Sequence, residues 1–373
     1  MDIGIAYDTK KEDLRVPLSP GAVNTLVKNG HPVYLLKGAG ESSDFRDEDY
    51  IKKGAKIVYS EEELYQRGKL IVTVTPPPVE TIPLINSESI LMSFLHLAAA
   101  SEKYLNELLK KKITAIGYEV ITDTSGEFPV LSSTSEIAGS LSIQIAAHYL
   151  QTNLGGKGIL LGGAPGIQPA RILIIGAGSV GRAAARAASA LGATVLIVDR
   201  DVKKLRLVEQ HFRERVATGF SSAHSLAEWA KDADVVIGAV YIKGAKTPVV
   251  ISEEVVASMK KKSLIIDLAI DQGGCVATSR PTTLKSPAYE YKGVIHYCVP
   301  NITSLVAHSS SLSLSHVLFP YVLEIADRAD RGENFLKAIP DLAAGTYIHK
   351  GKITMKVLAD FFKKEYSPIE SIL

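Results

Sequence analysis

The segment from Arg171 to Asp199 constrains the fold of this chain more than any other stretch of its sequence. It opens with an apolar, β-rich run, Ile172–Ile175, which leads directly into the sequence GAGSVG. An alanine-rich stretch follows, and then a second apolar run, Thr194–Val198, which leads directly to Asp199. Strand, glycine turn, helix and second strand in this order are typical of a Rossmann βαβ unit, in which a pyrophosphate lies at the helix N-terminus. We therefore predict a dinucleotide-binding unit.

The acid at the end of the second strand indicates which dinucleotide binds. Asp199 is placed to accept hydrogen bonds from the adenosine ribose hydroxyls. Its charge disfavours the 2′-phosphate of NADP, although Arg200 and Lys203 nearby soften this preference. The sequence therefore predicts NAD as the cofactor. The predicted contacts in this segment are Gly176, Gly178, Ser179, Val180, Gly181 and Asp199.

Composition excludes several other classes of protein. A chain of 373 residues is too long for one core and predicts two domains. Its formal net charge of +2 favours neither nucleic acid nor a membrane surface as a partner. The acidic start and the absence of a long apolar run predict a cytoplasmic protein. Cys275 and Cys298 form no CxxC or Cys/His cluster, so no metal site is expected.

Short strand-like runs alternate with helix-like stretches in the N-terminal part, which predicts parallel α/β sheets. The helix-like stretches include Gly21–Lys28 and Glu102–Lys110. We expect two Rossmann-like domains, each a doubly wound parallel sheet, with a cleft between them. The expected N-terminal strands are Ile3–Tyr7, Val33–Leu36, Lys56–Tyr59, Leu70–Thr75, Ile90–His96 and Ile113–Glu119, and the later ones include Asp234–Val240 and Ser263–Ile270.

The domain boundaries follow from two changes in pattern. Ser133 and Glu136 have the spacing of a capping box, which predicts a long helix that continues to about Leu150. After about Val306 the chain becomes serine-rich and then helical, as if it returned to the first domain. We predict a discontinuous substrate domain, residues 1–128 and 307–373, and a dinucleotide domain, residues 129–306.

Distinctive motifs occur along nearly the whole chain. They are IGIAYDTKKEDLRVPLSPGAVNTLVKNGH, KGAGESSDF, FLHLAA, YE at 118–119, TSEIAG, GGKGILLGGAPGIQPARILIIGAG, DLAIDQGGCVATSRPTT and FPYVLEIAD. Together these motifs resemble the family of alanine dehydrogenases and nicotinamide nucleotide transhydrogenase alpha subunits, and the length favours the former. The resemblance implies an NAD-dependent enzyme that interconverts L-alanine with pyruvate and ammonia and forms a hexamer or dimer.

Four residues in these motifs are candidates for the chemistry of oxidative deamination. Arg15 can grip a substrate carboxylate, because a guanidinium binds it through two hydrogen bonds; outside a motif it would be an ordinary surface charge. His96 titrates nearest neutrality and is the acid/base candidate, or else a hydrogen-bonded core histidine. Asp271 is expected to stabilise a cationic iminium intermediate or to relay protons near the nicotinamide, or else to cap a helix or form a turn. Glu119 is expected to orient Arg15 or another cation.

By family position we add Ser135, Val240 and Asn301 to the predicted cofactor contacts. The chain departs from the family pattern near the expected substrate pocket. A lysine that bonds the substrate in the family is Thr75 here, and a threonine hydroxyl lacks the charge-assisted hydrogen bond of an ammonium. The loop after Asn301 also differs, and His308 is a candidate to replace the lost cation.

Three functions remain open at this point. The chain is a dehydrogenase of L-alanine or a related small amino acid that tolerates Thr75, a relative that acts on another amino acid or imine, or a weakly catalytic NAD(H)-binding sensor. Retention of Arg15, His96 and Asp271 argues against the sensor, because a binding module needs none of them.

Overall fold

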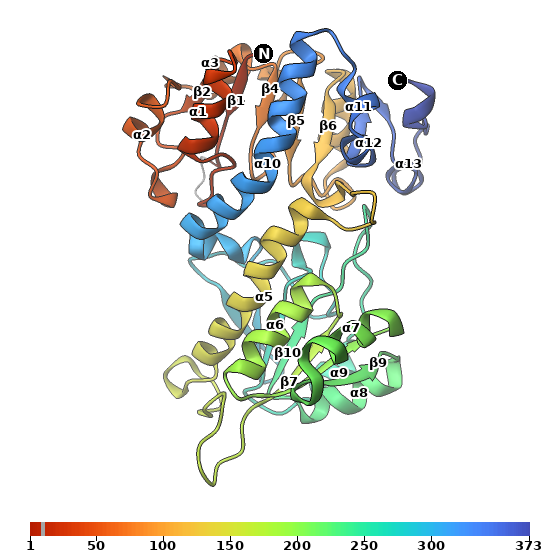
Figure 1. The fold of residues 1–373 in the computed structure, drawn as a ribbon. Coiled ribbons are helices and arrows are strands. Elements are labelled where there is room, and N and C mark those ends of the chain that lie inside the picture. Colours follow the sequence, from red (N-terminus) through yellow and green to blue (C-terminus); the bar gives the residue numbers. More distant parts are fainter. Residues whose placement is uncertain (9–11) are drawn as a thin grey trace. The chain divides into compact units, whose positions relative to one another are not determined.

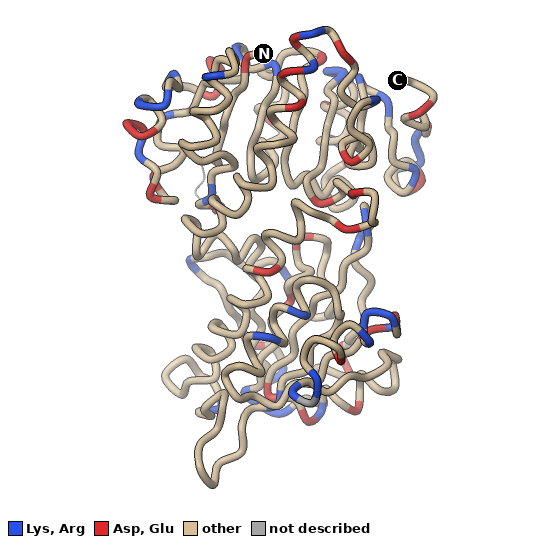
Figure 2. The backbone as a smooth tube through the Cα atoms, in the orientation of Figure 1, with Lys and Arg blue, Asp and Glu red and all other residues tan. Residues whose placement is uncertain are grey.

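The structure is a computed structural model that describes residues 1–8 and 12–373 (Figure 1). Two compact units divide the chain: residues 1–134, 243–245 and 303–373 form unit 1, and residues 135–242 and 246–302 form unit 2. Basic and acidic residues are interspersed along the backbone of each unit (Figure 2). Within the described ranges, no helix has the length and apolar character to cross a membrane.

Unit 1 is built on an eight-stranded sheet whose central strands are parallel. Two antiparallel strands, contributed by the C-terminal part of the chain, extend one edge of it. In spatial order the strands are β15 (Lys352–Ile353), β14 (Thr346–His349), β6 (Thr114–Gly117), β5 (Ile90–Ser93), β4 (Leu70–Val72), β1 (Ile3–Ile5), β2 (Val33–Leu36) and β3 (Lys56–Val58).

Helices cover both faces of this sheet, because successive residues of each strand point to opposite sides. Ile3 and Ile5 belong to one apolar core, whereas Ile71 and Leu91 belong to the other. The first core is covered by α1 (Pro20–Lys28), α2 (Asp47–Ile51), α10 (Ala307–Asp330), α11 (Phe335–Ala338) and α12 (Pro340–Ala344). The second is covered by α3 (Glu61–Arg67), α4 (Glu102–Lys110) and α13 (Lys356–Phe362).

Unit 2 is built on a seven-stranded sheet that is parallel except for one antiparallel edge strand. In spatial order the strands are β12 (Ala288–Tyr291), β13 (Val294–Tyr297), β11 (Leu264–Asp267), β10 (Val235–Gly238), β7 (Arg171–Ile175), β8 (Thr194–Asp199) and β9 (Ala217–Phe220). On one face α6 (Ser179–Ala190) and α7 (Val202–Phe212) pack against β7, β8 and β9. On the other, α8 (Ala223–Asp232) and α9 (Glu253–Ser258) complete a second apolar core.

This architecture confirms the predicted two-unit α/β fold and corrects some of its details. The sheets are mixed rather than fully parallel, because hairpin partners add antiparallel strands at the edges. Several predicted strands also end early. β5 ends at Ser93, and His96 has a φ of 42°, a left-handed conformation that no strand residue adopts. Glu119 follows β6 in a short 3₁₀ turn, Tyr118–Val120.

The predicted capping box is wrong. The long helix, α5 (Pro129–Tyr149), starts four residues before Ser133. Proline is favoured at the first helical position, because its φ suits the helix and its missing N–H needs no partner there. Ser133 therefore lies inside the helix, where its hydroxyl donates a hydrogen bond to the carbonyl of Val130 at 2.8 Å.

Candidate functional site

The glycine turn of unit 2 follows β7 directly, as the sequence predicts. Gly176 has a φ of 110°, and a Cβ there would lie 2.3 Å from the carbonyl oxygen of Ala239. A Cβ at Gly181 would lie 1.9 Å from the carbonyl oxygen of Gly176. Both glycines are therefore required by the fold itself: the first allows the turn, and the second allows α6 to pack close to the strand.

Gly178 differs, because the fold does not need a glycine there. Its φ is −73°, and a Cβ built on it would meet no atom within 4 Å. It is also the N-cap of α6, and a glycine has no side chain with which to cap the N–H groups of this helix end. Open space beside uncapped N–H groups at the positive end of a helix fits a phosphate group.

Asp199, the last residue of β8, holds the glycine turn in place. Its Oδ2 accepts a hydrogen bond from the backbone N–H of Ala177 at 2.8 Å. Its Oδ1 accepts one from the backbone N–H of Asp201 at 2.9 Å. A carboxylate oxygen has two lone pairs, so each oxygen can accept a further bond from a ligand hydroxyl.

The other predicted cofactor residues of unit 2 lie in separate segments. The backbone nitrogen of Val240 would be 3.4 Å from a Cβ on Gly176, so this residue borders the glycine turn. Ser135 is buried on α5, which crosses α6 so closely that a Cβ at Gly139 would lie 2.2 Å from the carbonyl oxygen of Val180. Asn301 precedes a 3₁₀ turn and has a φ of 53°.

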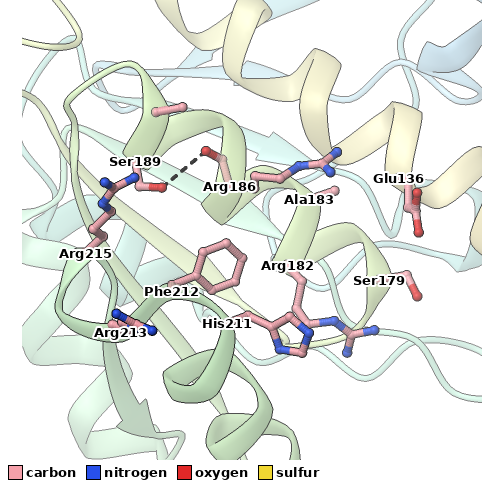
Figure 3. A pocket seen from close by; sticks show the side chains of 11 residues that line it. Glu136, Ser179, Arg182, Ala183, Arg186, Ser189, His211, Phe212, Arg213 and Arg215 are labelled. Carbon is pink, nitrogen blue, oxygen red and sulfur yellow. Dashed lines mark hydrogen bonds between the residues drawn. The ribbon is translucent and has the colours of Figure 1, made fainter.

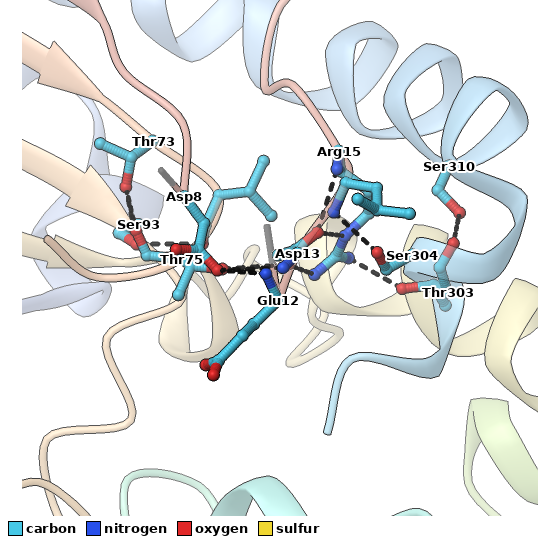
Figure 4. Close-up of polar contacts among 12 residues, drawn as sticks. Asp8, Glu12, Asp13, Arg15, Thr73, Thr75, Ser93, Thr303, Ser304 and Ser310 are labelled. Carbon is cyan, nitrogen blue, oxygen red and sulfur yellow. Dashed lines mark hydrogen bonds and ion pairs between the residues drawn. The ribbon is translucent and has the colours of Figure 1, made fainter. Parts of the chain in front are cut away.

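Unit 1 holds Arg15 in a buried polar network (Figure 4). The guanidinium pairs with Asp13 through Nε at 2.9 Å and Nη2 at 2.6 Å, and both side chains are 2 % exposed. Nη1 donates to the Thr303 hydroxyl at 2.8 Å. A guanidinium has five N–H groups and these bonds use three, so among the described residues one N–H group on each terminal nitrogen is left for a ligand.

The sequence did not predict three residues that contact Arg15, namely Asp13, Thr303 and Phe94. The ring of Phe94 contacts both candidate side chains: the Arg15 guanidinium carbon lies 5.8 Å from its centroid, and the His96 ring is stacked at 6.2 Å. The candidate for carboxylate binding and the acid/base candidate thus both contact the ring of Phe94. The position of Asp13 two residues before Arg15 was an available signal.

His96 has an unsatisfied nitrogen. Its Nδ1 is buried and has no hydrogen-bond partner among the described residues. Leaving a buried polar atom without a partner is costly, so such an atom points to a ligand or a function. Nearby, burial and the charge of Glu119 raise the pKa of Tyr118, whose ring packs edge-on against Phe94. Tyr118 is therefore a neutral phenol beside the candidate site.

Glu119 orients the backbone at His96. Its Oε1 accepts hydrogen bonds from the His96 N–H at 2.7 Å and the Tyr347 hydroxyl at 2.9 Å. Its Oε2 accepts one from the Leu95 N–H at 3.2 Å. These bonds connect Glu119 to the segment that carries the acid/base candidate, and its expected role in orienting Arg15 or another cation stays a prediction.

Thr75 lies in the same network as Arg15. Its hydroxyl donates to Asp13 Oδ2 at 3.0 Å, so the position of the family lysine faces the carboxylate that pairs with the guanidinium. His308 bonds through Nδ1 to the Ser43 carbonyl at 2.8 Å, and its ring packs against Phe45 at 5.1 Å. Its predicted role as a replacement cation stays a prediction.

Asp271 lies in unit 2 in a short 3₁₀ turn, Ile270–Gln272, and is partly exposed. The buried Asp267 fixes the ends of this turn. It accepts hydrogen bonds from the backbone N–H groups of Ala269 at 3.1 Å and Cys275 at 2.9 Å. Burial, followed by the charge of Asp267, raises the pKa of the Cys275 thiol well above its ordinary value.

The fold and the glycine turn define a two-unit α/β protein with a Rossmann-type nucleotide-binding unit. Two family models match the chain: "Alanine dehydrogenase/PNT, N-terminal domain" over residues 4–138 and "Alanine dehydrogenase/PNT, C-terminal domain" over residues 142–356. The chain belongs to the alanine dehydrogenase/PNT family.

Full-length relatives agree with this assignment. The chain is 40 % identical over 377 residues to the alanine dehydrogenase of Methanococcus maripaludis and 38 % identical over 376 residues to that of Halomonas elongata, with 100 % of each chain covered. Among solved structures, an L-alanine dehydrogenase matches with a TM-score of 0.88 and 36 % identity, covering 97 % of this chain and 99 % of the other.

Proposed function

We propose that the chain is an NAD-dependent amino acid dehydrogenase that catalyses the reversible oxidative deamination of L-alanine, or a related small amino acid, to a 2-oxo acid and ammonia. One observation carries the proposal: Phe94 contacts both the buried Arg15 and His96, whose Nδ1 is buried without a partner among the described residues. A carboxylate anchor beside a proton-transfer group is what this reaction needs from the substrate-binding unit.

Each residue has a role in this scheme. The two remaining N–H groups of Arg15 bind the substrate carboxylate, while Asp13 fixes the guanidinium plane. His96 moves the proton that the substrate nitrogen and carbonyl oxygen exchange during imine hydrolysis. Asp271 supports the positive charge of the iminium intermediate. When bound, NAD⁺ supplies the acceptor for the hydride from the substrate Cα.

The glycine turn would hold the cofactor. Its pyrophosphate fits beside Gly178 at the uncapped start of α6, where the chain leaves open space. Asp199 retains a lone pair on each oxygen for the ribose hydroxyls. Ser135, Val240 and Asn301 are proposed to complete the cofactor contacts. A homo-oligomeric assembly and a cytoplasmic location stay predictions.

A second candidate function is a dehydrogenase of another substrate, and Thr75 favours it. Among the described residues of this network, Asp13 pairs with Arg15, and the position of the family lysine contributes a neutral hydroxyl. A substrate that carries an extra cationic group could supply the missing charge, as could His308. This alternative keeps the same fold and the same reaction.

The test is NADH oxidation in the presence of ammonia and a panel of 2-oxo acids that includes pyruvate. Rapid turnover with pyruvate supports the alanine reaction, and turnover with another oxo acid alone supports the changed substrate.

His96→Asn should abolish turnover and leave NADH binding intact. Asparagine is the matched replacement, because it tolerates the left-handed backbone at this position better than alanine does. Thr75→Lys should raise activity on pyruvate if the substrate has changed.

If the whole panel is inactive while NADH still binds, the proposal fails and the NAD(H)-binding sensor replaces it.

A further inference from the structure

Unit 2 contains a basic groove that shares only Ser179 with the predicted cofactor contacts. It has a volume of about 1000 Å³ and runs along α6, between Glu136 on α5 and the segment that ends α7 (Figure 3). Four arginines from α6 and from the chain after α7 line it: Arg182, Arg186, Arg213 and Arg215.

Among the described side chains, these charges have no carboxylate partner. Arg182 donates through Nη1 to the Ala177 carbonyl at 3.0 Å, which is a neutral acceptor. Among the side chains that the structure describes, no carboxylate lies within ion-pairing distance of Arg186, Arg213 or Arg215. Glu136 is the one described carboxylate in the lining, and it is exposed.

Arginines gathered in one concavity repel each other and raise the local concentration of anions. Arg182 and Arg186 are four residues apart on α6 and therefore lie on the same helix face. Each guanidinium presents paired N–H groups, which match the geometry of phosphate oxygens better than a lysine ammonium does. The side chain of Phe212 adds an apolar surface beside them.

We propose that this groove binds a small organic polyphosphate, at a site separate from the dinucleotide turn. The volume suits a ligand of nucleotide size, since small-molecule pockets typically measure about 300–1,000 Å³. A long nucleic acid is disfavoured, because the formal net charge of the chain is only +2. Of the predicted cofactor residues only Ser179 lines the groove, whereas Gly178 and Asp199 do not.

The experiment is a calorimetric titration of inorganic tripolyphosphate into the full chain at low ionic strength, with and without saturating NADH. The test variant is Arg186→Gln combined with Arg215→Gln. The matched control is Lys204→Gln combined with Arg206→Gln, which removes two exposed positive charges from α7 outside the groove. Thermal unfolding of all three proteins shows whether they remain folded.

We expect one equivalent of tripolyphosphate to bind whether or not NADH is present. The groove variant should raise its Kd about 100-fold, at about tenfold per arginine, and the control should change it less than about threefold. Displacement of the probe by NADH would mean that the groove only extends the dinucleotide site, and would overturn the proposal. Equal binding by wild type and groove variant would overturn it as well. If NADH itself fails to bind, the titration without it still tests the groove, while the proposed dehydrogenase function fails separately.

Discussion

The Oε1 atom of Glu119 lies 2.7 Å from the backbone nitrogen of His96 and accepts its hydrogen bond. The φ of His96 is 42°, so its backbone is in a conformation that non-glycine residues rarely adopt. A buried carboxylate thus holds the backbone of the acid/base candidate in position. Glu119 is a positioning residue in this arrangement.

Replacing Glu119 with Gln should disturb that position. The amide keeps one acceptor oxygen but turns an NH₂ donor toward a backbone N–H, so stability should fall by about 1–3 kcal/mol. We expect kcat to fall more than KM rises, and the pH profile of kcat to shift. Tyr347→Phe is the matched control, because it removes only one bond to Glu119 and leaves the bonds to Leu95 and His96. An unchanged pH profile with lower stability would assign Glu119 a purely structural role.

Alanine at two glycines of the turn should separate folding from cofactor binding. Gly178→Ala fits the backbone and meets no atom, but alanine is a poorer N-cap than glycine, so stability should fall by no more than about 1 kcal/mol. The new methyl group enters the space proposed for the pyrophosphate, and the Kd for NADH should rise at least about tenfold. Gly176→Ala places an alanine at a φ of 110°, with its Cβ 2.3 Å from the carbonyl oxygen of Ala239. This change should cost about 3 kcal/mol or more of stability.

Fluorescence titration with NADH and denaturant unfolding measure these two effects. Normal NADH affinity in a folded Gly178→Ala protein would contradict the proposed place of the pyrophosphate.

Arg15→Lys keeps the positive charge but removes the planar guanidinium with its paired N–H donors. A lysine cannot pair with both oxygens of Asp13 in the same geometry while it also binds a substrate carboxylate. We expect kcat/KM for the oxo acid to fall by about 10²-fold or more. Stability should fall by about 3 kcal/mol, because a buried carboxylate loses its partner. Steady-state kinetics and urea unfolding test both effects.

Arg67→Lys is the control for Arg15→Lys. It alters an exposed pair with Glu63 and should change stability by less than about 0.5 kcal/mol. If Arg15→Lys kept wild-type kcat/KM, Arg15 would have no part in substrate binding.

Asp234 should make the stability of unit 2 depend on pH. Burial alone would raise the pKa of this carboxyl, but a hydrogen bond from the Arg171 backbone and bonds to Lys157 and Lys260 bring it below the ordinary 3.8. Because the folded-state pKa is lowered, this contribution to stability is present above pH 3.8 and is lost as the pH falls through the folded-state pKa.

Asp234→Asn should therefore cost about 2 kcal/mol near neutral pH, and less at acidic pH. Urea unfolding at several pH values measures the difference. Asp232→Asn, which alters an exposed residue 3.7 Å from Arg171, is the control and should have little effect at any pH. A cost that does not change with pH would contradict the assigned ion pairing.

Local patterns predicted the parts of the fold that depend on neighbouring residues. The βαβ segment that starts at Arg171 carries its own turn chemistry, so its strand, glycine turn and helix are all present. Strand β12 at the edge of its sheet and strand β14 beside the edge strand β15 were missed, because short strands with few apolar residues are defined by their pairing partners. The start of α5 was misplaced because two local signals competed, and Pro129 outweighed the capping residues.

The site was predicted less completely for the same physical reason. Arg15 and His96 stand in recognisable motifs, but their common contact with Phe94 depends on how separate segments pack. Asp267 looked like part of a buried strand, and the bonds that its carboxylate accepts from Ala269 and Cys275 exist only in the folded chain.

The discontinuity of unit 1 determines the order in which the protein can be completed during synthesis. Its first apolar core includes Leu314, Leu318 and Val322 of α10, and the edge of β6 pairs with β14. Residues 135–302 emerge from the ribosome before either piece, so unit 2 can finish folding while the first 134 residues still have an open sheet edge and an uncovered apolar face. During synthesis, residues 1–134 are therefore the part of the chain most exposed to aggregation, until residues 303–373 are made and cover their sheet edge and apolar face.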